Sequence, residues 1–148
     1  MKFIPYETGI PALAKEKGFN EPCLAKWIIY VKGVTVPDFR YNNRQALAES
    51  IDEGVLFNHN GKDVSNLNGN DGKDFLWSAP TYEQIKDWFR EEHNIHIMYM
   101  ICGSPTKVLG YKWFVQVGMK EDDCFQTKMI KDYYVGMTEA IKEAFKLI

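Results

Sequence analysis

The sequence lacks any hydrophobic run long enough to cross a lipid bilayer. Its longest stretch without a charged residue, from His93 to Thr106, is interrupted by His, Gly, Ser and Pro, whereas a membrane helix needs roughly 20 apolar residues. The first residues stop being apolar after Ile4, too early for the hydrophobic region of a signal peptide. We therefore expect a cytoplasmic protein with no membrane partner.

Cysteine is scarce, and neither sign of charge dominates. Cys23, Cys102 and Cys124 lie far apart and form no CxxC pair, so the sequence predicts reduced, buried thiols rather than a disulfide framework. The net charge is −2, which provides no long-range field to attract DNA or an anionic membrane.

Motifs for catalysis, metal binding and nucleotide binding are also missing. The sequence contains no GxSxG, no GxGxxG and no GxxxxGK[ST]. His93 and His96 are close to Cys102, but they fall at a predicted helix end and a predicted strand start, so their side chains need not converge on a metal. We assign no catalytic, metal-binding or cofactor-binding residue and expect no cofactor. An enzyme with an active site assembled from distant residues remains an alternative, and the role of His96 stays open.

The residues that are present predict one α+β domain spanning 1–148. Apolar residues make up 45% of the chain and aromatic residues 14%, enough to fill a core without metal or disulfide support. The Asn- and Gly-rich stretch at about 58–74 is interpreted as an irregular exposed loop within that domain.

Hydrophobic periodicity predicts the elements. In the first half we expect a short helix after Thr8, a strand from Cys23 to Val31 and a helical patch over 43–53. The second half reads helix, strand, strand, a further short strand, helix. We expect an antiparallel sheet of three to five strands, packed on one face by the helices at 80–92 and 133–147. The strands of the second half are expected at 95–101, 108–119 and 124–129.

Protein–protein contact is the favoured function. The chain has 4 Trp, 8 Tyr and 9 Phe, more than the amphipathic stripes require, and Tyr99, Tyr133 and Tyr134 are among those not clearly directed inward. Aromatic residues are enriched at interfaces. We therefore expect a non-enzymatic accessory or regulatory protein with a protein partner, or one that self-associates as a homodimer.

Nucleic-acid binding is the alternative function. The order of elements from 80 to 148 resembles that of a double-stranded-RNA-binding domain, which contacts phosphates through lysines at the start of its last helix. The candidate nucleic-acid-binding residues are Lys107, Lys112, Lys128 and Lys131.

Three segments resemble small uncharacterised proteins of bacterial phages, prophages and other mobile elements. They are PYETGIPALAKEKGFNEPCLAKW (5–27), APTYEQIKDWFREEHNIHI (79–97) and DYYVGMTEAIKEAFKLI (132–148). The resemblance carries no known activity and no catalytic residues. It implies a small accessory protein in a bacterial, or phage-infected bacterial, cytoplasm.

Overall fold

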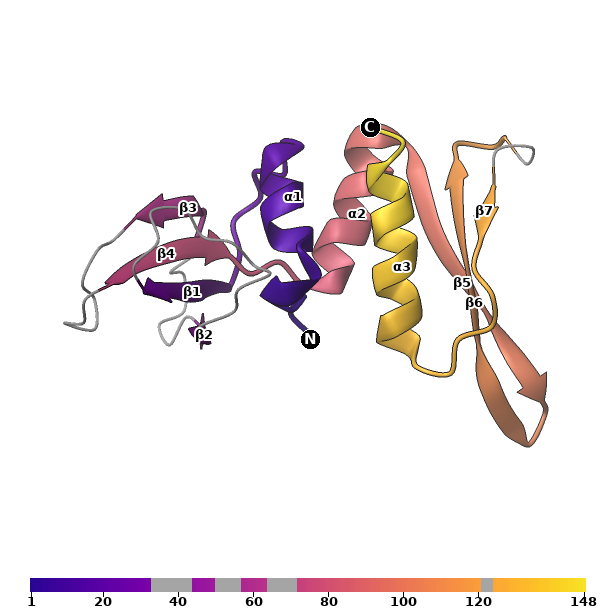
Figure 1. The fold of residues 1–148 in the computed structure, drawn as a ribbon. Helices are drawn as coiled ribbons and strands as arrows, with labels where there is room; N and C mark the ends of the chain where they lie inside the picture. The colour runs from indigo at the N-terminus through magenta and orange to yellow at the C-terminus, as the bar shows by residue number, and fades with distance from the viewer. Residues whose placement is uncertain (33–43, 50–56, 64–71, 121–123) are drawn as a thin grey trace. The chain divides into compact units, whose positions relative to one another are not determined.

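Residues 1–32, 44–49, 57–63, 72–120 and 124–148 are described by a computed structural model (Figure 1). They group into two compact units, Met1–Thr81 and Tyr82–Ile148. The expectation that both halves belong to a single domain stays a prediction, and each unit is described by itself below.

The first unit opens with a 3-10 turn, η1 (Tyr6–Thr8), followed by a short helix, α1 (Ile10–Glu16). The Thr8 hydroxyl accepts a hydrogen bond from the Ile10 amide at 3.2 Å, which satisfies one of the free amides at the helix start. Ile10 and Ala14 are buried. The predicted helix is therefore confirmed.

An antiparallel sheet in the order β2-β1-β4-β3 completes this unit. β1 (Ala25–Lys32) confirms the strand expected there, and it pairs with β2 (Arg44–Glu49) on one side and β4 (Gly72–Ser78) on the other. β3 (Asn60–Asp63) pairs with the outer edge of β4. Tyr6 from η1, Ile29 from β1 and Phe75 from β4 form a buried cluster against which Ala12, Trp27 and Trp77 pack.

Two predictions for this unit are wrong. Residues 44–49 form a strand instead of part of a helical patch, because pairing with β1 from Ala25↔Glu49 to Tyr30↔Arg44 satisfies their backbone groups. The loop expected at 58–74 contains β3 and the start of β4; residues 64–71 of that loop lie outside the described residues. Both predictions relied on local conformational propensity: Ala and Gln favour a helix, and Asn and Gly favour a turn. Pairing with a neighbouring strand overrides these propensities.

The second unit confirms the α+β class and the predicted order of elements (Figure 1). Both helices pack on the face of a three-stranded antiparallel sheet, in the order β5-β6-β7, that carries the buried Ile97, Trp113 and Val115. The elements are α2 (Tyr82–His93), β5 (Ile95–Ser104), β6 (Lys107–Val117), β7 (Phe125–Gln126) and α3 (Tyr133–Phe145).

Local signals place the helix ends in this unit. Asn94 adopts a left-handed φ of 55° between α2 and β5, as its position after the helix predicts. The Asp132 carboxylate accepts hydrogen bonds from the amides of Tyr134 and Val135, both at 2.9 Å, and so caps α3. None of the helices in the described ranges is both long and apolar enough to cross a membrane.

Candidate interaction surface

The strands β5 and β6 continue past the helices and past β7 as a two-stranded hairpin (Figure 1). We call residues 98–109 the arm. Among the described residues, β7 pairs with Phe114 and Val115, and a further bridge joins Ile130 to Tyr111, so neither pairs with a residue of the arm. Six apolar arm side chains are each 44% to 57% exposed. They are Met98, Tyr99, Met100, Ile101, Val108 and Leu109.

Both faces of the arm carry exposed apolar side chains. Along a strand, alternate side chains point to opposite faces, so Met98 and Met100 lie on one face and Tyr99 and Ile101 on the other. Monomeric proteins rarely leave a contiguous apolar surface of this kind in water. The arm is therefore the strongest candidate for a binding surface among the described residues.

The pairing of the two strands near the tip of the arm depends on Gly103. The register between β5 and β6 shifts between Cys102 and Gly103, and Gly103 has a φ of 149°. A Cβ atom at this position would lie 2.2 Å from the carbonyl oxygen of Lys107. Only glycine fits this close approach of the two strands.

An aromatic cluster supports the base of the arm. The Tyr133 ring lies 5.1 Å from the Tyr99 ring, 5.3 Å from Tyr111 and 4.9 Å from Trp113, measured between centroids. Burial, and then the neighbouring Tyr99, raise the pKa of Tyr133 to about 12. Tyr99 and Tyr133, singled out in the sequence as surplus aromatics, thus pack against each other where the arm leaves the body of the unit.

β5 also has an open edge. Among the described residues it pairs with β6 alone, which leaves the backbone N–H and C=O groups of its other edge without a strand partner. Proteins usually protect such an edge with Lys, Pro or a covering segment. The β5 sequence, IHIMYMICGS, contains no Asp, Glu, Lys, Arg or Pro. An edge of this type can accept another strand by β-addition.

The structure brings together two of the four candidate nucleic-acid-binding lysines. Lys107 and Lys131 line one hollow of about 480 Å³, together with Val108, Leu109, Gly110 and Tyr111. Lys112 lies on β6, and Lys128 is exposed in the segment after β7; neither lines this hollow.

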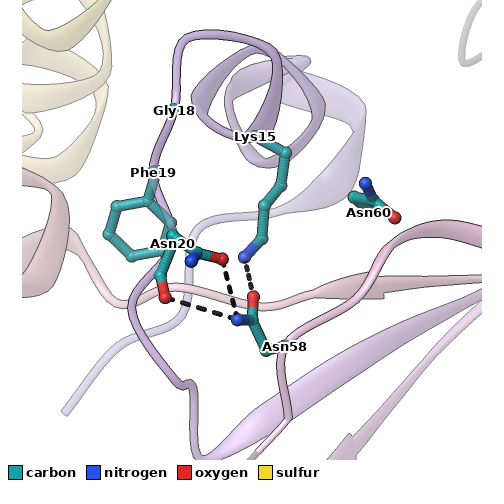
Figure 2. Close-up of a pocket in the computed structure, with 6 residues that line it drawn as sticks. All are labelled: Lys15, Gly18, Phe19, Asn20, Asn58 and Asn60. Atoms are coloured by element: carbon teal, nitrogen blue, oxygen red, sulfur yellow. Dashed lines mark hydrogen bonds between the residues drawn. The ribbon is translucent and has the colours of Figure 1, made fainter.

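A second hollow, of about 400 Å³, lies in the first unit (Figure 2). The Lys15 ammonium donates to the Asn58 side-chain oxygen, and the Asn58 amide donates to the Asn20 side chain at 2.8 Å. Lys15 also lies 5.4 Å from the centroid of the Phe19 ring, and burial lowers its pKa. These groups bind one another, so their contacts hold the end of α1 against the chain before β3. Its lining residues are Lys15, Gly18, Phe19, Asn20, Asn58 and Asn60.

The two histidines considered as metal ligands in the sequence contact other groups in the structure. The His93 ring packs edge-on against Trp88 at 4.6 Å, and the His96 Nε2 atom lies 3.3 Å from the Asn94 side-chain oxygen. The described residues contain no group of three or more His, Cys, Asp or Glu side chains suited to hold a metal ion. Cys23 is buried, and burial raises the pKa of its thiol to about 11.

Comparison of the chain with protein-family models, with curated proteins and with solved structures finds no match in any of the three. The resemblance to phage proteins therefore stays a prediction. Sequence reasoning predicted strands at 95–101 and 108–119 but missed the exposure of the arm, although the sequence carries a signal for it in the uncharged stretch from His93 to Thr106. That stretch contains all of β5 and the turn into β6.

Proposed function

We propose that this chain is a non-enzymatic accessory or regulatory protein that acts by binding protein through the arm. The observation that carries the proposal is the exposure of six apolar side chains on both faces of the arm, next to an open strand edge. The bacterial or phage-infected cytoplasm is part of the proposal and rests on the resemblance of the three sequence segments alone.

The energetics favour binding over solvent exposure. Fully burying one Leu, Ile or Met side chain stabilises a complex by about 1.5–3 kcal/mol relative to leaving it in water. The arm side chains are about half exposed, so each has roughly half of that contribution still to gain. Part of the gain offsets the lost freedom of the two partners, which is why a cluster of such residues, rather than a single one, is needed.

The test is protein capture by the tagged full chain from bacterial lysate, with and without nuclease. The double variant Met100→Lys and Ile101→Lys places a charge on each face of the arm. We expect this variant to capture at least tenfold less protein than the wild-type chain does. The same reduction is expected for any untagged copy of the chain itself. The control is Val135→Lys, which charges an exposed apolar site on α3. Equal capture by wild type and the arm variant would contradict the proposal.

Nucleic-acid binding is the second candidate, favoured by the shared hollow of Lys107 and Lys131. The two ammonium groups offer a phosphate two positive charges at one place. If this reading holds, duplex RNA or DNA should shift in a gel at low salt, and the variant Lys107→Glu with Lys131→Glu should abolish the shift. Lys142→Glu, on an exposed site of α3, is the control. A shift that survives the double variant would rule this hollow out as the contact.

A further inference from the structure

We propose that the partner of the β5 edge is a second copy of this chain, and that two β5 strands pair antiparallel to join two three-stranded sheets into one of six strands. This inference rests on the proposed function, because it names the partner of the same arm. It concerns the strand edge and a two-fold dimer, whereas the proposed function requires only that the arm bind protein.

An antiparallel edge is complementary to itself. When two identical strands pair antiparallel about a two-fold axis, each N–H and C=O of one edge meets the matching group of the other. The contact closes after two copies, so it produces a dimer rather than a fibre. The open edge of β5 has the length for such a ladder, since the strand runs from Ile95 to Ser104.

The side chains favour a second copy over a charged partner. In a symmetric contact a charge at or near the two-fold axis would lie close to its own copy, which destabilises the pair. β5 contains no Asp, Glu, Lys or Arg, so its symmetric pairing involves no repulsion between such residues. The methionines of the two copies would lie together on one face, and the Tyr99 and Ile101 side chains on the other.

A contact along a single strand edge is small. Of the six exposed arm side chains, only the four on β5 lie next to that edge, Met98, Tyr99, Met100 and Ile101, and a specific, stable interface buries roughly 1,200 Å² or more in total from both partners. We therefore expect a dimer that forms as the protein concentration rises, instead of an obligate one.

Symmetry makes a sharp geometric prediction. Antiparallel strands in one sheet are related by a two-fold axis perpendicular to the sheet, so one residue of β5 must face its own copy. Residues on either side of it face different residues of the partner. Directly opposite residues have Cβ atoms about 4.5–5.5 Å apart, close to the separation that a disulfide spans after a small adjustment.

The first experiment is light scattering of the full chain across roughly 1 to 100 µM, a range that brackets micromolar association. We expect the mass to rise from monomer to dimer. Met98→Lys with Met100→Lys should remain monomeric, Val135→Lys should dimerise as wild type does, and circular dichroism should show all three folded. A wild-type chain that stays monomeric throughout overturns the inference. If arm-dependent capture of other proteins persists, the proposed function nevertheless stands.

The second experiment is a scan of single cysteines at every position of β5 from Ile95 to Ser104, in a chain with Cys124→Ser and, except at position 102 itself, Cys102→Ser. Mild oxidation should cross-link one position to a disulfide dimer far more than its neighbours. This pattern supports the pairing even where a lysine variant fails to fold. Cross-linking that is absent at every position, or equal at every position, overturns it.

Discussion

At the scale of single residues, burial sets the chemistry of the thiol groups. Cys23 is fully buried, and its backbone forms an isolated β-bridge with that of Phe57. Burial raises the pKa of its thiol from 9.0 to about 11. The thiolate is the reactive form. Cys23 therefore combines poor access with a small thiolate fraction, whereas Cys124 is exposed.

We predict that a thiol reagent at pH 8 modifies Cys124 in the folded chain at least a hundredfold faster than Cys23, which should react only after denaturant is added. Because folding favours the neutral form of the Cys23 thiol, this group contributes fully to the stability of the fold below pH 9. The contribution is lost as the pH rises through the raised pKa of about 11. The measurement is mass spectrometry of time points for the Cys102→Ser chain. Fast labelling of Cys23 in the native protein would contradict its burial.

At the scale of elements, the packing of α3 on β6 depends on a glycine within the helix. Gly136 is buried, and a Cβ atom there would lie 2.5 Å from the Cδ1 and Nε1 atoms of the Trp113 ring. Trp113 is itself fully buried, so it has little room to move. The close approach of helix and strand explains why a residue that weakens helices stands in the first turns of α3.

We predict that Gly136→Ala destabilises the chain by about 1–3 kcal/mol, through overpacking against Trp113. The sign is diagnostic, because the same change at an exposed helical site stabilises by about 1 kcal/mol. Urea unfolding measures the difference. The control is Val135→Ala, next along the helix at a half-exposed site, for which we expect a change within about 0.5 kcal/mol. A Gly136→Ala chain as stable as wild type would mean that the helix lies farther from β6.

At the scale of the whole molecule, the two compact units follow each other without an exposed linker. The first ends at Thr81 and the second begins at Tyr82, and both residues are buried. Domain boundaries usually fall in exposed, flexible segments. Units of this size also bury a smaller fraction of their surface than larger domains do.

We therefore predict that the full chain unfolds in urea as one cooperative transition, as a single domain does. Trp27 and Trp77 lie in the first unit, and Trp88 and Trp113 in the second. In a Trp27→Phe, Trp77→Phe chain the fluorescence reports on the second unit alone, and its midpoint should coincide with that from circular dichroism of the same variant. Two separate midpoints would identify two independent domains.

Local sequence signals were sufficient to predict much of the secondary structure of the second unit. The apolar spacing over 80–92 and 133–147 and the Asn94 that follows the first of these helices act within a few residues of the chain, so they are readable without knowledge of the fold. The alternation over 95–101 and 108–119 similarly predicts the hairpin. The same reasoning failed for β2 and β3, because their backbone partners lie in distant parts of the chain and local propensity carries no information about them.

By itself the sequence determined the α+β class, the helices of the second unit and an uncharged strand without protective residues. Only the tertiary structure decided that this strand lies at the edge of its sheet as far as the chain is described, and that its end extends beyond the helices. It also decided that Lys107 and Lys131 line one hollow while Lys112 and Lys128 do not. The reason is physical: periodicity specifies which side of an element is apolar, but exposure depends on how far neighbouring elements reach, and that is a property of the assembled fold.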